Sequence, residues 1–162
     1  MLSWVDGCPA ADLPLGDRGL AYGDGLFETI AVRGGRAVLL SRHLARLAEG
    51  LRRLAINLDP VALETELQAF FSELGEGVAK LIITRGDGLR GYAPPQPAQP
   101  RRILLGNPLP SYPAANAEQG VCLYPCVTRL AEQPLLAGLK HLNRLEQVLS
   151  LIHISEPTRQ EA

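Results

Sequence analysis

The sequence has almost no net charge and no long hydrophobic run. Its 16 lysines and arginines nearly balance 17 acidic residues, which gives a formal net charge of −1 at pH 7. Nucleic acids and acidic membranes attract proteins through a clustered excess of positive charge, so the sequence predicts neither partner. A transmembrane helix needs about 20 consecutive apolar residues, and no such run is present. We therefore expect a protein that acts without nucleic acid and without a membrane.

Cysteine is also scarce. The three cysteines are Cys8, Cys122 and Cys126, and an odd number does not form a complete disulfide framework. With no secretory leader in the sequence, we expect reduced thiols in a cytoplasmic protein. Cys122 and Cys126 are spaced closely enough for a metal site. Because no second cysteine pair completes four ligands, we predict no metal.

Apolar residues are plentiful, at 46% of a chain of 162 residues. This is enough for a hydrophobic core, and the length fits one domain or one domain plus part of another. The pattern predicts an α+β fold in which residues 1–106 form an antiparallel sheet with two helices. The proline-containing stretch 107–119 is typical of a linker. Residues 120–150 are expected to begin a second domain.

Local signals place most of the elements. Gly34 and Gly35 supply the positive φ angles of a two-residue hairpin turn. Ser41 is the expected N-cap of one helix, and Asp59 with Pro60 is expected to begin the next. Strands are predicted at 2–5, 12–15, 27–32, 37–40, 78–84, 102–105 and, as the start of a second sheet, 121–128. Helices are predicted at 42–56, at 60–74 and from 143 onward.

Lys140 is the candidate reactive residue. Leucines precede and follow it at positions 135, 136, 139 and 142. An amine held among apolar neighbours loses water on folding, which lowers its pKa and frees it to act as a nucleophile. A Schiff-base lysine needs this environment. The same pattern also fits a lysine that extends outward from a leucine-rich core into solvent.

The segment around this lysine resembles a known family. Residues 138–149 read Gly-Leu-Lys-His-Leu-Asn-Arg-Leu-Glu-Gln-Val-Leu, similar to the lysine segment of aminodeoxychorismate lyases. These are fold-type IV enzymes of the pyridoxal phosphate (PLP) family, alongside branched-chain and D-amino-acid aminotransferases. The resemblance extends over residues 1–150. It implies a D-amino-acid aminotransferase-like fold, a homodimer in the intact protein, and PLP carried by Lys140 as a Schiff base.

A glycine-rich stretch near the N-terminus adds to the resemblance. Asp-Arg-Gly, followed by Tyr-Gly-Asp-Gly-Leu-Phe-Glu-Thr, resembles a family motif whose strand lines the cofactor cavity. Phe27 and Thr29 would face the substrate, because alternate side chains of a strand share one face. The resemblance implies that Thr29 assists catalysis, whereas Glu28 on the opposite face is structural. Taken alone, the stretch also fits an ordinary hairpin connection.

Residues 43–47 resemble the His-x-x-Arg-Leu motif, in which the arginine binds the PLP phosphate. Arg46 suits this role because a guanidinium can bind two phosphate oxygens at once and stays charged. His43 is expected to give structural support. A solvated charge on the helix surface would give Arg46 the same pattern.

Residues 85–92 resemble the Arg-Gly-x-Gly-x-Arg-Gly-Tyr loop, which lies near the family's active site across the dimer interface. The lyase substrate bears carboxylates, so Arg90 and Tyr92 are candidate substrate-binding residues. Without the resemblance, a mobile surface loop would be the simpler interpretation.

The resemblance ends near Leu149. Residues 151–162 are expected to be a non-family tail and the second domain to be incomplete. The family's acidic residue that keeps the cofactor's ring nitrogen protonated would lie farther on, so weak PLP binding and little activity are expected.

The implied function is PLP-dependent conversion of 4-amino-4-deoxychorismate to 4-aminobenzoate and pyruvate in folate biosynthesis. An aminotransferase of the same fold, which needs a 2-oxo-acid acceptor, and an inactive fragment are the alternatives.

Overall fold

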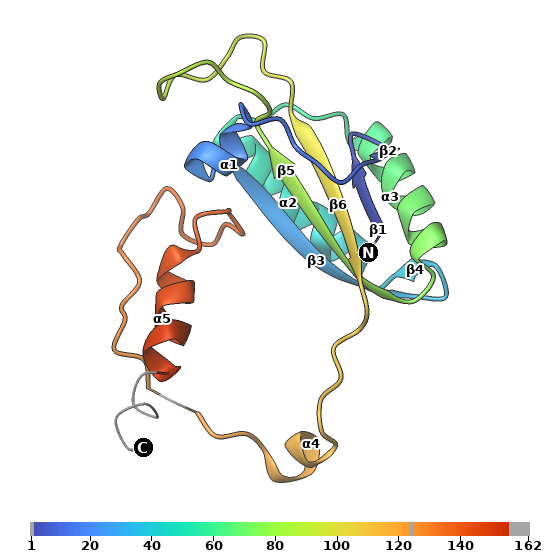
Figure 1. Cartoon of the computed structure of the whole chain (residues 1–162), viewed down its shortest axis with the longest axis vertical. Helices are drawn as coiled ribbons and strands as arrows, with labels where there is room; N and C mark the ends of the chain where they lie inside the picture. Colours follow the sequence, from blue (N-terminus) through green and yellow to red (C-terminus); the bar gives the residue numbers. More distant parts are fainter. Residues whose placement is uncertain (1, 124, 156–162) are drawn as a thin grey trace. The chain divides into compact units, whose positions relative to one another are not determined.

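The computed structural model describes residues 2–123 and 125–155, and its main feature is a six-stranded sheet of order β2-β1-β6-β5-β3-β4 (Figure 1). All its strand pairs are antiparallel, which confirms the predicted class. The strands are β1 (Leu2–Val5), β2 (Cys8–Pro9), β3 (Gly25–Arg33), β4 (Arg36–Ala37), β5 (Gly77–Thr84) and β6 (Arg101–Asn107). The helices are α1 (Arg18–Tyr22), α2 (Leu40–Leu54), α3 (Pro60–Leu74), α4 (Ala115–Gln119) and α5 (Leu145–Ser155).

The chain divides into two compact units. The first contains Met1–Leu109 together with Gly138–Asn143, and the second contains the remainder. The whole sheet and helices α1 to α3 belong to the first unit, whereas α4 and α5 belong to the second. The lysine segment therefore packs as part of the first unit, although the sequence assigned it to a domain over 120–150.

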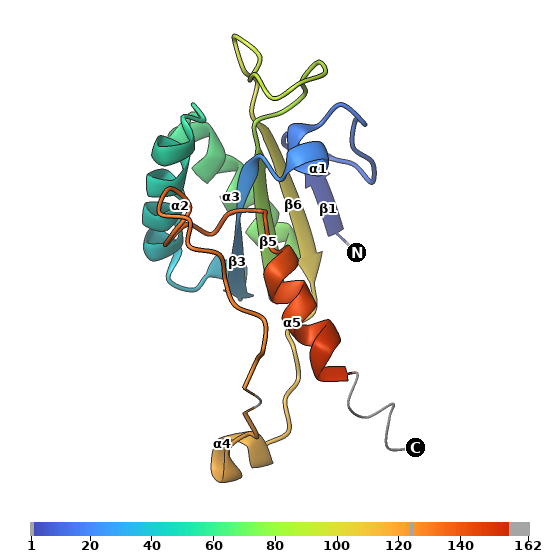
Figure 2. The same ribbon diagram turned by 90° about the vertical axis from the view of Figure 1, so that its left-hand side faces the viewer.

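Helices α2 and α3 cover one face of the sheet (Figure 2). Helix α3 begins as predicted, because the Asp59 side chain accepts hydrogen bonds from the amides of Val61 and Ala62 and Pro60 is the first helical residue. It ends at Gly75, whose φ is 67°. Val61 of this helix is exposed. It lies in the first turn, where the helix enters from a surface loop.

Helix α2 begins differently from the prediction. Its N-cap is Leu39 in the left-handed conformation, with no side-chain capping bond, and Ser41 lies within the helix. Strand β4 has only two residues. The Val38 amide donates to Ala31 O, which is the last backbone bond of the hairpin, and the chain then turns at Leu39. The helix ends at Leu54 rather than at position 56, and Ile56 becomes a core residue.

The hydrophobic core lies between the sheet and the two helices. Trp4 of β1 meets Phe70 of α3 edge-on, with 5.5 Å between ring centroids. The other face of the sheet, which we call the outer face, carries Phe27 and Thr29 of β3 and Lys80 of β5. Fully buried residues on the helix side include Ile30, Val32, Leu67, Phe71, Ala79, Leu81, Ile83 and Leu104.

Two predicted strands are absent from the described structure. Residues 12–15 form no strand, because the tight turn at Asp6 and Gly7 starts the return at Cys8, and Pro9 has no amide to continue the ladder. Residues 121–123 and 125–128 are also not strands. A strand needs a partner, and the described part of the chain offers this segment none.

Among the described residues, no helix is both long enough and apolar enough to cross a bilayer. All three cysteines are exposed and unpaired. The described residues also contain no group of three or more His, Cys, Asp or Glu that could hold a metal ion.

Candidate active site

The lysine segment is hydrogen-bonded to one edge of β3. The Phe27 amide donates to Lys140 O over 2.9 Å, and the Leu142 amide donates to Gly25 O over 3.0 Å. A Cβ at position 25 would collide with the carbonyl of Ile83 and the side chain of Leu142, so this close approach requires glycine. Two segments more than 100 residues apart are thereby fixed side by side.

The Lys140 amine lies over an aromatic ring. Its Nζ is 4.1 Å from the ring centroid of Phe27, at a distance where a cation is attracted to a ring face. Lys140 and Phe27 are half-buried, and Leu139 is buried. Leu135 is exposed, so the leucines do not all surround the amine as the sequence suggested.

A second amine, which sequence reasoning missed, shares this ring. Thr29 is paired with Lys80 across β3 and β5, and Lys80 Nζ is 5.6 Å from the Phe27 centroid. Phe27 and Thr29 lie on one face of β3, as predicted. Lys80 could have been noticed as the one charge within an otherwise apolar strand. Two amines lie beside one ring, on the face that also bears Thr29, and this arrangement is suited to an anionic substrate.

Glu28 points to the helix-covered face and is buried. Arg46 donates two hydrogen bonds to it, from Nε to Oε1 at 2.7 Å and from Nη2 to Oε2 at 2.5 Å. His43 Nδ1 lies 2.8 Å from Oε2. The structural roles expected of Glu28 and His43 agree with this arrangement, which links helix α2 to strand β3.

Arg46 and Lys140 approach β3 from different sides. Arg46 binds Glu28 on the helix side, whereas Lys140 lies over Phe27 on the outer face. The Arg46 side chain is 49% exposed, and a guanidinium has five N–H donors. It therefore retains donors for a second anion after binding Glu28. Phosphate binding by Arg46 stays a prediction.

Replacing Glu28 with glutamine should reduce the loss of stability in acid. Burial raises the pKa of Glu28, but hydrogen bonds from Arg46 and His43 outweigh it and lower the pKa below 4.5. Because the folded-state pKa is the lower one, Glu28 stabilises the fold above pH 4.5, and this contribution is lost as the pH falls through the folded-state pKa. Urea unfolding at a series of pH values should show that the free energy of unfolding of Glu28→Gln falls less steeply toward acid pH than that of the parent.

Glu49→Gln is the matched control for this measurement. Hydrogen bonding to Arg52 also lowers the pKa of Glu49, but this pair lies on the exposed surface of α2. Water screens such a pair. The free energy of unfolding of the control should therefore fall toward acid pH as steeply as that of the parent. Equal flattening in both variants would contradict a special role for buried Glu28.

The remaining predicted residues, Arg90 and Tyr92, lie on an exposed loop. Tyr92 is 86% exposed, and its ring meets Tyr22 with 5.5 Å between centroids. The loop belongs to the same unit as Lys140. Its outward side chains are available to a ligand or to a second copy of the chain.

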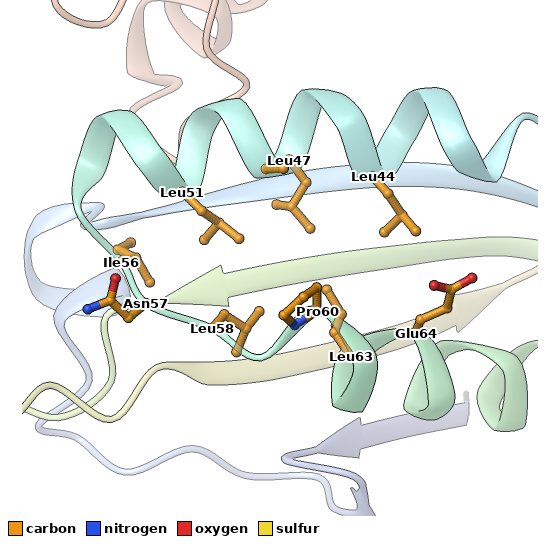
Figure 3. Close-up of a pocket in the computed structure, with 10 residues that line it drawn as sticks. Leu44, Leu47, Leu51, Ile56, Asn57, Leu58, Pro60, Leu63 and Glu64 are labelled. Carbon is orange, nitrogen blue, oxygen red and sulfur yellow. The ribbon is translucent and has the colours of Figure 1, made fainter.

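A separate apolar pocket of about 380 Å³ lies on the helix side of the sheet. Figure 3 shows Leu44, Leu47 and Leu51 of α2 facing Leu58 and Leu63 across it. None of the predicted site residues lines this pocket.

Comparison with known proteins identifies the family. The profile of the amino-transferase class IV family matches residues 25–162. The chain belongs to this family. Its fold-type IV architecture is confirmed by the crystal structure of 4-amino-4-deoxychorismate lyase from Pseudomonas aeruginosa. That structure is 70% identical with a TM-score of 0.91, and the match covers 93% of this chain and 56% of that one.

The chain is also similar to two curated proteins. The aminodeoxychorismate lyase of Vibrio harveyi is 39% identical over 153 residues, which are 93% of this chain and 56% of that protein. A putative branched-chain-amino-acid aminotransferase of Methanocaldococcus jannaschii is 29% identical over 141 residues, which are 84% of this chain and 48% of that protein. The chain thus spans about half the length of the relatives it matches.

Proposed function

We propose that this chain supplies the cofactor lysine and the substrate-side wall of an aminodeoxychorismate lyase. The reaction converts 4-amino-4-deoxychorismate to 4-aminobenzoate and pyruvate, a step in folate biosynthesis. The observation that carries the proposal is the position of Lys140 Nζ, 4.1 Å from the ring centroid of Phe27 on the face that also bears Thr29. Identities of 39% and 70% to proteins named as this lyase support it.

The described residues fit PLP, the cofactor of the class IV family. The half-buried primary amine of Lys140 can bond to an aldehyde, and the exposed part of the Arg46 guanidinium can donate to a phosphate. When bound, PLP withdraws electrons from the substrate carbon that bears the amine. We therefore assign covalent attachment of PLP to Lys140 and phosphate binding to Arg46.

Three residues of the outer face then divide the chemistry. With PLP bound, Lys140 Nζ would take the proton from the amine-bearing carbon of the substrate. The Thr29 hydroxyl, on the same face as Phe27, would donate a hydrogen bond that assists departure of the enolpyruvyl oxygen. The Lys80 ammonium pairs with a substrate carboxylate, because it lies beside the same ring as Lys140.

The products distinguish this lyase from an aminotransferase. Any turnover of the chain, supplied with PLP and 4-amino-4-deoxychorismate but no 2-oxo acid, should release pyruvate and 4-aminobenzoate in equal amounts. Lactate dehydrogenase coupling measures pyruvate, and chromatography measures 4-aminobenzoate. Turnover that appears only after a 2-oxo acid is added would favour the aminotransferase. A folded protein with no turnover under either condition would favour an inactive fragment.

We also propose a homodimer and a cytoplasmic location. Leu89 and Tyr92 are 91% and 86% exposed on their loop, which leaves them available to a second copy of the chain. The three exposed, unpaired thiols are compatible with a reducing compartment.

A further inference from the structure

Arg18 is a buried arginine to which the proposed reaction gives no role. It is the first residue of α1 and is only 5% exposed. Its Nε donates to Asp24 Oδ2 over 2.9 Å. Buried arginines are uncommon and need partners for their charge and their five donors, so the remaining donors of Arg18 indicate what this side chain holds.

Those donors bind three consecutive backbone carbonyls of one loop. Nη2 donates to Tyr92 O over 2.8 Å, and Nη1 lies 3.3 Å from both Gly91 O and Ala93 O. These carbonyls directly follow Arg90. One guanidinium therefore fixes the backbone that carries both candidate substrate-binding residues.

Side-chain packing holds the same loop from two sides. The Arg18 guanidinium lies 4.9 Å from the Tyr22 ring centroid, and that ring meets Tyr92 at 5.5 Å. A Cβ at Gly88 would come within 2.9 Å of Arg18 Cδ. The loop residues 88–93, which we call the arginine-held loop, are thus packed against one buried side chain.

The side chains of the arginine-held loop reach solvent. Leu89 and Tyr92 are almost fully exposed, and Arg90 is exposed as well. A loop whose backbone is held by a buried group and whose side chains reach solvent is preorganised for recognition, because less order must be gained on binding. Arg85 also binds Asp24, the partner of Arg18 Nε, through Oδ2 at 2.8 Å and Oδ1 at 3.0 Å, but it makes no bond to the loop carbonyls given above.

We propose that Arg18 is a positioning residue that holds the arginine-held loop so that Arg90 and Tyr92 meet a substrate carboxylate. This assignment rests on the proposed lyase function for the identity of the ligand. The anchoring itself rests only on the contacts of Arg18. A lysine in its place keeps the charge, but its three donors on one nitrogen cannot reach Asp24 and three carbonyls together.

Arg18→Lys and Arg85→Lys in the 162-residue chain provide a matched comparison. Both arginines bind Asp24, with side chains 6% and 12% exposed, but only Arg18 binds the loop carbonyls. Trypsin cleavage after Arg90 and amide hydrogen exchange over 89–93 report local opening of the loop. We expect Arg18→Lys to accelerate both by about tenfold or more at an unchanged thermal midpoint, because a lost anchor lowers the free energy of local opening. Arg85→Lys should leave both rates close to those of the parent.

Steady-state kinetics test whether the arginine-held loop binds the substrate. In the presence of PLP, Arg18→Lys should raise KM for 4-amino-4-deoxychorismate about tenfold with kcat little changed, as expected for lost positioning of a binding group. Equal loop opening in the two variants, or no opening in Arg18→Lys, would overturn the anchoring. Loop opening with an unchanged KM would overturn the assignment of the loop to the substrate. Absence of turnover in the parent would count against the lyase proposal alone, because the cleavage comparison needs no activity.

Discussion

Replacing Lys140 with alanine is expected to abolish borohydride-stable attachment of PLP to the chain. Attachment needs a primary amine within reach of the aldehyde, and Lys140 Nζ lies over the Phe27 ring where the substrate-side residues gather. Peptide mapping after reduction should find the label on Lys140 in the parent and none in the variant. Any turnover rate should fall by a factor of about 10² to 10⁴, the range for loss of a general base.

Lys80→Ala is the control for this experiment. Lys80 lies beside the same ring, 5.6 Å from its centroid. The variant therefore tests whether any amine near Phe27 can bind PLP or only the amine of Lys140. The control should keep the label on Lys140 while weakening substrate binding. If the label survives in Lys140→Ala and disappears in Lys80→Ala, then Lys80, rather than Lys140, is the residue to which PLP attaches.

Asp17→Ala should be the most destabilising of the substitutions considered, by about 3–5 kcal/mol, the cost of removing one partner from a buried charged network. The carboxylate is 1% exposed and accepts hydrogen bonds from Thr84 Oγ1 at 2.7 Å and Arg101 Nη1 at 2.6 Å. It also caps α1 by accepting from the amides of Gly19 and Leu20. Urea unfolding followed by circular dichroism would measure the loss.

Asp87→Ala tests whether the loss of stability in Asp17→Ala comes from the buried hydrogen bonds or from the loss of a charge beside Arg101. Asp87 binds the same Arg101 with two bonds of 2.9 Å, but its side chain is 52% exposed. Water can replace it, so we expect a loss below about 1 kcal/mol. A loss equal to that of Asp17→Ala would show that the charge on Arg101, rather than the buried hydrogen-bond network, dominates.

Local signals in the sequence were sufficient where structure is decided locally. Helix α3 begins at Pro60 after the Asp59 cap and ends at Leu74, as predicted, since capping and proline geometry act within one turn. Gly34 and Gly35 form the predicted hairpin turn for the same reason. The cap of α2 was wrong because the hairpin that ends beside Leu39 decides where the helix begins, and a favourable Ser41 cannot override it.

The candidate site was only partly predictable because its members meet through long-range pairing. The family resemblance pointed to Lys140, Phe27 and Thr29, and the structure brings all three to one region of β3. Lys80 was missed, because only the register of β5 against β3 places it beside Phe27. Arg18 was missed as well, since its carbonyl partners lie more than 70 residues away and carry no side-chain signal.

The attachment of the lysine segment to β3 also has a consequence for association between molecules. An uncovered strand edge presents a row of unpaired amides and carbonyls, on which other chains can add strands. Lys140 and Leu142 occupy the backbone groups of Phe27 and Gly25, and β4 pairs with the far end of the strand. The segment that carries Lys140 therefore also blocks the addition of another strand along this part of β3.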